Sequence, residues 1–277
     1  MQRNKEAVDE RYKRTLPVVK VNKLIQDLES RLDLILTTHL HHSMQSIEHF
    51  DAHYIFESCW QFLLKDTISM SLFPYFKNSF QLNYKEFMLL FLIRKLHQSN
   101  INYVPSVGLV QQDSLLDIAN SKGSAFILSV HNGFAFSGKV VSDLGLKGAT
   151  ISSDPLILNT FDRSGIKRDN DVNVIKDDKY CLAHLRGSIS NGEIICCNVD
   201  YAGPDGKCVY VSPALFECAV KFNVPLYFAK STVSEDGNVS VGLKRSDYKY
   251  SVADFMSFIN SSPDVFRVMT ARAYRRT

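Results

Sequence analysis

The chain has 277 residues, of which 45% are hydrophobic and 22% are charged, and its formal net charge is +3. This composition is typical of a globular protein with a sizeable core, and it excludes disordered and collagen-like chains. The weak positive charge also argues against a dedicated nucleic-acid binder, which carries a denser basic face. We therefore expect no nucleic-acid partner.

The first residues, MQRNKEAVDERYKR, are highly charged and lack the apolar segment of a secretory signal. The longest apolar run of the first hundred residues, Phe87 to Ile93, is far shorter than the roughly 20 residues that a membrane span needs. The six cysteines form no CxxC pair, which fits a reducing compartment. We expect a cytoplasmic protein whose only membrane contact is peripheral, at the inner face.

Residues 1–105 are predicted to form an N-terminal helical region packed on the core. Apolar residues recur there at spacings of three and four, which is the pattern of an amphipathic helix; they are Val21, Ile25, Leu28, Leu32 and Ile35. Further helices are predicted over 54–64 and 84–96. The segment from Ser99 to Ser106, which contains Pro105, is predicted to be a linker.

Residues 106–277 are predicted to form an α/β core, because short apolar runs alternate with helical stretches. The predicted strands cover 125–130, 149–152, 194–199, 226–229 and 239–243, and the predicted helices cover 134–144, 180–189 and 214–222. This alternation indicates a mostly parallel sheet flanked by helices. The strand over 194–199 is apolar on both faces, which favours a central position.

One histidine stands where α/β proteins place their ligands. His131 directly follows the first predicted strand, and Asn132 and Gly133 open the next helix. Ligands of open α/β sheets bind beyond the carboxyl ends of the strands, and a helix N-terminus supplies N–H groups for a developing oxyanion. A histidine that only caps the helix or completes a turn explains the position equally well.

Two carboxylates follow strands in the same way. Asp200, in the segment from Asn198 to Gly203 that also contains Tyr201, leaves the predicted central strand, and Asp154 follows the strand over 149–152. Asp200 is a candidate to bind a ligand or to orient a neighbour. It is an equally good candidate to start the turn toward Pro204, since aspartate is common in turns.

Several segments carry a family resemblance through their order and spacing. They are FILSVHNGFAF, SGKVVSDLGLKG, ATISS, NTFDRSGIK, CLAHLRGSISNGE, IICCNVDYAG and VYVSPALFECAVKFNVPLYFAK. Over about residues 115 to 245 the chain thus resembles the bacterial lipid A biosynthesis acyltransferases of the lauroyl/myristoyl type, within the wider lysophospholipid acyltransferase superfamily. The common order and spacing of these segments carry the resemblance.

The resemblance implies transfer of an acyl group from an acyl carrier protein or coenzyme A thioester to a hydroxyl or amine acceptor. The thioester is a substrate, and no bound cofactor is implied. His131 stands in the place of the family's general base, and an imidazole suits this task because its pKa lies near the working pH. Arg163 or Arg168 would lie near phosphate or the oxyanion, and Asp200 matches the family's aspartate after the central strand. The substrate-binding residues implied are Asn132, Gly133, Arg163, Arg168 and Tyr201.

Two departures from the family pattern stand out. The family has an acid five positions after the histidine, with four residues between, and here that position is Phe136. Three explanations are open. Another carboxylate, Asp154 or Asp200, replaces the missing acid, or the acceptor is an amine, which needs less activation by a base. In the third, the chain binds an acyl group or a carrier protein without catalysis. In addition, no membrane-anchoring helix is visible and Val211-Ser212-Pro213 replaces a Phe-Gly pair, which favours a small soluble acceptor.

One histidine pair raises the question of a metal. His49 and His53 stand at i and i+4, a spacing at which two imidazoles on a helix can share a metal ion. No carboxylate completes an HExxH pattern around them. We therefore expect no metal site.

Overall fold

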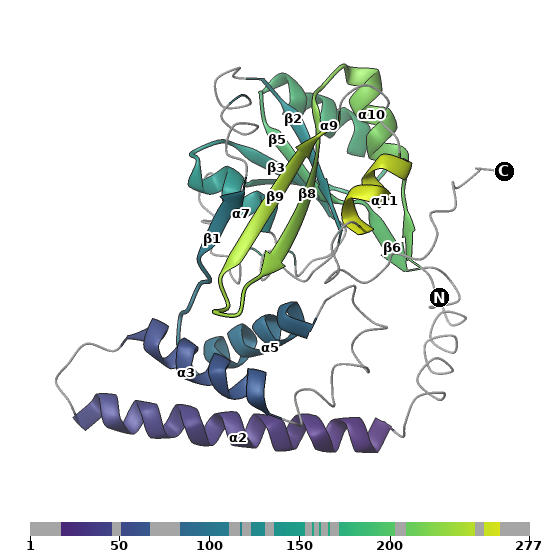
Figure 1. Cartoon of the computed structure of the whole chain (residues 1–277). Helices are drawn as coiled ribbons and strands as arrows, with labels where there is room; N and C mark the ends of the chain where they lie inside the picture. The colour runs from purple at the N-terminus through teal and green to yellow at the C-terminus, as the bar shows by residue number, and fades with distance from the viewer. Residues whose placement is uncertain are drawn as a thin grey trace. The chain divides into compact units, whose positions relative to one another are not determined.

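The computed structural model describes residues 18–45, 51–66, 84–110, 117, 123–130, 136–152, 157, 161, 166, 172–202, 209–246 and 252–260. The chain divides into two compact units, Met1–Tyr103 and Val104–Thr277 (Figure 1). The first is helical in its described part, and the second contains the sheet.

The helical unit consists of α2 (Val18–Gln45), α3 (Ala52–Lys65) and α5 (Tyr84–Gln98). Their apolar residues recur at helical spacing and become buried, so that the three helices bury one stripe each. On α2 these are Leu28, Leu32 and Leu36, and α3 contacts both of the other helices. The ring of Tyr103 stacks on Phe56 with centroids 4.0 Å apart.

The α/β unit is built on a seven-stranded sheet with the order β1-β9-β8-β2-β5-β3-β4. The strands are β1 (Val107–Val110), β2 (Ala125–Ser129), β3 (Gly148–Ser152), β4 (Val172–Lys176), β5 (Ile194–Asn198), β8 (Leu226–Val233) and β9 (Val239–Arg245). From β8 to β4 all neighbours are parallel. Strand β9 pairs antiparallel with β8, and β1 runs parallel to β9, so two strands at one edge are reversed.

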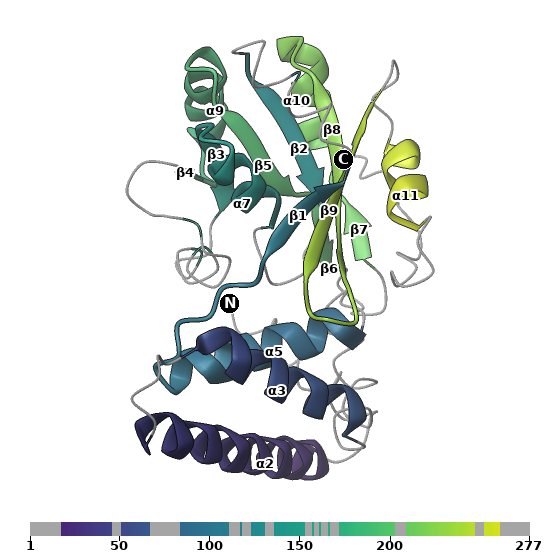
Figure 2. The ribbon, with the colours of Figure 1, turned by 60° about the vertical axis from the view of Figure 1, so that its left-hand side comes forward.

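Helices cover both faces of this sheet (Figures 1 and 2). Helix α7 (Phe136–Asp143) packs on one face, against strands that include β3, β5 and β8. The other face carries α9 (Cys181–Ser190), α10 (Ala214–Phe222) and α11 (Val252–Asn260). The α/β fold with a mostly parallel, helix-flanked sheet, predicted from the alternation of apolar runs, is thereby confirmed.

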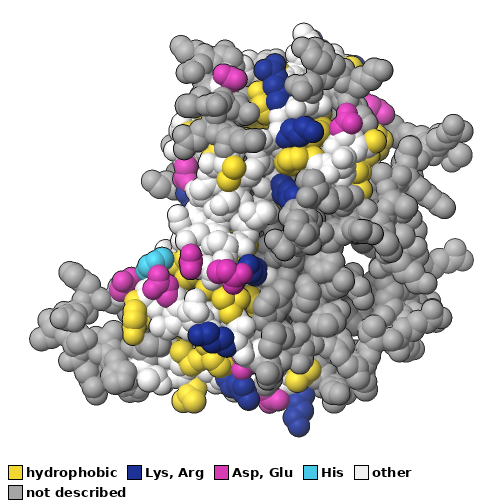
Figure 3. Space-filling view, viewed as in Figure 1, with side chains coloured by type: hydrophobic (Ala, Val, Ile, Leu, Met, Phe, Trp, Pro, Cys, Tyr) yellow, Lys and Arg dark blue, Asp and Glu magenta, His cyan; other side chains and the backbone are white. Residues whose placement is uncertain are grey.

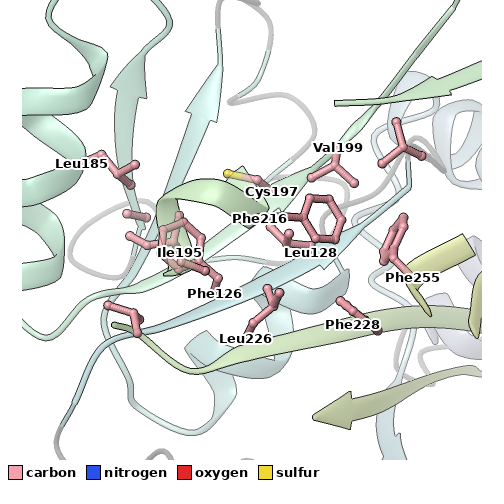
Figure 4. Packing of buried hydrophobic residues seen from close by; sticks show 14 of the residues in the cluster. Phe126, Leu128, Leu185, Ile195, Cys197, Val199, Phe216, Leu226, Phe228 and Phe255 are labelled. Atoms are coloured by element: carbon pink, nitrogen blue, oxygen red, sulfur yellow. The ribbon is translucent and has the colours of Figure 1, made fainter. Parts of the chain in front are cut away.

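The core under α9, α10 and α11 is formed by alternate residues of the central strands. Phe126 and Leu128 of β2 and Ile195 and Cys197 of β5 point to this side, as Figure 4 shows, and Phe228 of β8 meets Phe216 and Phe255 there. The rings of Phe228 and Phe255 lie edge to face at 5.3 Å. Alternate residues of each strand reach this core because successive side chains of a strand point to opposite faces of the sheet.

Some elements differ from the sequence-based expectation. Strand β8 continues to Val233 instead of ending at 229, and the predicted helix start at 134 lies outside the described residues, which show α7 from Phe136 on. Strands β1 and β4, the small ladder of β6 (Asp200–Ala202) with β7 (Val209–Val211), and α11 were not predicted. β1 and β4 are edge strands whose residues are mostly exposed or half-buried, so they lack the continuous apolar run that marks β2 and β5.

The surface mixes charge and apolar groups. On the face shown in Figure 3, basic, acidic and apolar side chains are interspersed over the described part of each unit. The large exposed apolar residues among the described ones are Leu34, Tyr54, Val110, Leu144, Val174, Tyr180, Leu182 and Val220. No described helix has the length and apolarity that crossing a membrane requires.

Candidate functional site

The chain leaves β2 and β5 toward opposite faces of the sheet, although the two strands are neighbours. After β2 it continues to α7, and after β5 to α10, which packs on the other face. Adjacent parallel strands with this arrangement form a topological switch point, and open α/β sheets bind their ligands in the crevice at its carboxyl edge. The carboxyl ends of β2 and β5 are therefore the candidate site.

The two strand ends are in register and joined by side chains. Ser129, the last residue of β2, pairs with Asn198, the last residue of β5. The Ser129 hydroxyl donates to Asn198 Oδ1 at 2.6 Å, and the backbone N–H of Val199 donates to the Ser129 carbonyl at 2.9 Å. The sequence then reads Val130-His131 after one strand and Val199-Asp200 after the other. Both strands thus end in the same pattern of polar residue, valine and titratable residue.

The start of α7 lies on the same face as Ser129 and Asn198. Cys196, two residues before Asn198, is hydrogen-bonded by the Ser137 hydroxyl in the first turn of α7. Burial, together with the neighbouring Cys197, raises the pKa of the Cys196 thiol, and the hydrogen bond from Ser137 only partly opposes this rise. Cys196 is therefore an uncharged thiol at neutral pH, and it supplies no nucleophile to the site.

Of the predicted site residues, Asp200 and Tyr201 fall within the described part of the chain. Asp200 begins β6, where it opposes Val211 of β7, and only 7% of its surface is exposed. Tyr201 opposes Tyr210 in the same ladder. A carboxylate buried to this degree requires polar partners. Turn formation alone does not account for Asp200, since it lies in a strand.

The other predicted site residues lie outside the described part. They are His131, Asn132, Gly133, Asp154, Arg163 and Arg168. The strands that precede His131 and Asp154 in the chain, β2 and β3, are described, so the sheet order constrains the two carboxylate candidates. Asp154 comes two residues after the end of β3, which β5 separates from β2. Asp200 comes two residues after the end of β5, the direct neighbour of β2.

Phe136, which stands where the resembling family has an acid, is the first residue of α7. The first turn of this helix contains no acidic residue. A carboxylate that orients the imidazole of His131 must therefore come from another element than this helix turn.

The histidine pair whose spacing raised the question of a metal, His49 and His53, belongs to the helical unit. His53 pairs with Glu57, its Nε2 lying 3.2 Å from Oε1, and His49 is outside the described part. Among the residues that the structure describes, no group of three or more histidine, cysteine or acidic side chains is arranged to hold a metal ion.

Two residues of the candidate site had no role in the sequence-based predictions. Ser129 closes a strand and Asn198 opens the Asp200 segment, and each alone reads as an ordinary polar strand end. The available signal was the shared pattern of the two strands, AFILS-Val-His and IICCN-Val-Asp. Only the pairing of β2 with β5, which are distant in sequence, brings the two polar residues together.

No protein-family model matches the chain, and no curated protein matches it either.

Proposed function

We propose that the chain is an acyltransferase that moves an acyl group from an acyl carrier protein or coenzyme A thioester to a hydroxyl or amine acceptor, with His131 as general base. The observation that carries this proposal is the pairing of Ser129 with Asn198 at the switch point. It brings together the two strand ends from which the sequence continues to His131 and Asp200. The acyl chemistry itself comes from the resemblance of residues 115 to 245 to the lipid A acyltransferases.

Asp200 is the better candidate to orient His131. A residue after β5 is one strand spacing, about 4.8 Å, from the end of β2, whereas a residue after β3 is about twice as far. Asp200 is also buried, and a buried carboxylate stabilises an imidazolium more strongly than an exposed one. Asp200 would thus take the task of the acid that Phe136 replaces. Orientation of the imidazole by a carboxylate is worth about 10⁴-fold in rate in the serine-protease triad.

The proposed reaction is direct transfer. His131 accepts the proton of the acceptor O–H or N–H while the oxygen or nitrogen forms a bond to the thioester carbonyl carbon. The carbonyl oxygen becomes an oxyanion, and when it re-forms the carbonyl, the carbon–sulfur bond breaks. The thiolate leaves and takes up the proton from the imidazolium. Arg163 or Arg168 would bind phosphate groups of the donor or the oxyanion, and Asn132, Gly133 and Tyr201 would contact the substrates.

The test is acyl transfer measured by mass spectrometry, with a panel of acyl thioesters and of amine and hydroxyl acceptors. We expect His131→Ala to lower turnover by at least about 10²-fold, since general-base catalysis contributes 10²–10⁴-fold. His184→Ala is the matched control, because His184 is an exposed histidine on α9. A His131→Ala protein with the full activity of the wild type would refute the assignment of the base.

The alternative is a relative that binds an acyl chain or a carrier protein without turnover. The observation that favours it is the absence of an acid from the first turn of α7, where the family has its acid. This alternative predicts that an acyl thioester binds without being consumed, whichever acceptor is offered. Asp200→Asn separates the two cases, because it lowers turnover by orders of magnitude only if a reaction takes place.

A further inference from the structure

The side chain of Asn198 is the exposed polar group at the candidate site whose orientation the structure fixes. Its Oδ1 accepts the hydrogen bond from the Ser129 hydroxyl at 2.6 Å. An amide that accepts through its oxygen turns its Nδ2 group, with two donor hydrogens, away from that partner. Asn198 is exposed at the carboxyl end of β5, and the hydrogen bonds of the described residues include none from its Nδ2.

The surroundings favour a bound group with negative charge at this place. The side chains of Ser129 and Asn198 are on the face that α7 covers, because Val130 and Val199 pack into the core on the other face. Ser137 links the first turn of α7 to Cys196, two residues before Asn198 on the same face. The first turn of a helix has unsatisfied N–H groups and a positive partial charge. The Asn198 amide and the start of α7 are thus on one side of the switch point.

We propose that Asn198 contacts the substrate and donates Nδ2–H to the thioester carbonyl oxygen, most strongly when this oxygen becomes an oxyanion. Ser129 is a positioning residue that acts through Asn198 by fixing its amide. This inference rests on the proposed acyl transfer and adds a donor that neither the motifs nor the resemblance assigned. An amide side chain with fixed orientation suits this role, because it needs no reorganisation when the charge develops.

The decisive variant is Asn198→Asp, which keeps an oxygen for the Ser129 hydroxyl and replaces the donor by an acceptor. We expect kcat to fall by about 10²-fold or more, the usual loss on removal of one oxyanion donor, with little change in KM. Asn191→Asp is the matched control, because Asn191 is exposed at the end of α9, before β5 begins. It should keep the wild-type kcat. Thermal unfolding of each variant verifies the fold.

The role of Ser129 is tested by coupling. Ser129→Ala should lower kcat less than Asn198→Asp does, and Ser129→Thr should restore activity because it keeps the hydroxyl. In the double variant the loss should equal that of Asn198→Asp alone, since residues that act as a unit are not additive. A purely structural role of Ser129 would instead lower kcat further in the double variant, which would overturn its assignment as a positioning residue.

A second measurement separates this inference from the proposed function. The side-chain amide signal of Asn198 is followed by NMR while a 2-oxoalkyl thioether of pantetheine is added, in which a methylene between sulfur and carbonyl carbon prevents hydrolysis and keeps the carbonyl oxygen. If the wild type turns over thioesters and Asn198→Asp is equally active, the inference is wrong and the proposed function stands. If no thioester is consumed but the amide signal shifts, the proposed function fails and Asn198 remains a ligand contact. If neither turnover nor a shift of the amide signal is seen, both the proposed function and this inference are overturned.

Discussion

The carboxylate of Asp66 is buried at the end of α3. Its side chain is 3% exposed, and Arg31 Nη1 of α2 lies 2.7 Å from its Oδ2. Burying a charge is costly unless it is paired, so that this contact ties two helices of the helical unit at the point where α3 ends.

We expect Arg31→Ala to lower the free energy of unfolding by about 1–2 kcal/mol, because it leaves a buried carboxylate with fewer donors while water still screens the exposed half of the pair. Urea unfolding followed by circular dichroism measures this. Asp33→Ala is the control, since it breaks the more exposed pair with Lys95 and should cost less than about 1 kcal/mol. Equal losses in the two variants would contradict the burial argument.

Single residues also show what a sequence can and cannot predict about the site. His131 and Asp200 were accessible as candidates because each directly follows an apolar strand, and the carboxyl end of a strand is a general place for ligands. The pairing of Ser129 with Asn198 was not accessible, since 68 residues separate them and only the sheet order makes their strands neighbours. The same order distinguishes Asp200 from Asp154.

At the scale of elements, α11 is held by aromatic rings. Phe255 is fully buried and lies edge to face against Phe228 of β8 at 5.3 Å and against Phe216 of α10 at 5.6 Å. Its ring therefore joins one strand and two helices on the face opposite α7 (Figure 4).

Phe255→Ala is expected to lower the free energy of unfolding by about 3–5 kcal/mol, the usual cost of removing a buried ring. Part of this loss is the edge-to-face contact with its two partners. Guanidinium unfolding is the measurement, and Phe258→Ala, on the same helix but half-buried, should cost clearly less. If Phe258→Ala were the more destabilising variant, α11 would be held by another contact than the Phe255 ring.

The elements predicted best were those with long apolar runs or clear helix ends. Helix α10 was predicted at its observed bounds, and β2 and β5 to within one residue. The two strands are mostly buried, α10 buries Phe216 and Ala219 on one side, and the ends of all three are marked by polar residues or by glycine and proline nearby. The reversal of β9 and β1 could not be predicted, since an apolar run does not encode the direction of its neighbour. The exposed edge strand β4 has too few apolar residues to stand out.

At the scale of the whole molecule, the pKa values of several thiol and phenol groups, in both units, are raised. Burial raises the pKa of Cys59 from 9.0 to about 12 and, together with the charge of Glu57, that of Tyr103 from 10.0 to about 12. In the α/β unit, burial raises the pKa of Cys197 to about 11, although hydrogen bonds from Ile151 and Thr150 oppose this rise. In each case the folded protein holds its proton more tightly than the unfolded chain.

The sign of the pH dependence follows. The stability that these groups contribute is complete below their ordinary pKa values near 9 to 10 and is lost as the pH rises toward 12. We expect the midpoint of thermal unfolding to fall steadily above about pH 9, measured by circular dichroism between pH 7 and pH 11. In Cys59→Ala the fall should be shallower, because one of the shifted protons is gone. An unchanged slope in that variant would contradict the contribution of Cys59.

The backbone pairing between β3 and β5 covers only the first two residues of β3, and beyond it the Cys197 sulfur contacts β3. The two strands pair at Gly148 and Ala149, after which the Ile151 N–H donates to Cys197 Sγ at 3.3 Å while β3 stays paired with β4 through Ser152. A thiol is a weaker acceptor than a carbonyl. Beyond Ala149, then, the side chain of Cys197 takes the place of a backbone ladder between β3 and β5, through its contacts with the Ile151 N–H and the Thr150 hydroxyl. Backbone ladders continue on both sides of this place, between β3 and β4 and between β2 and β5, so that here side-chain contacts and the core packing of Ile151 and Ile175 hold the sheet together.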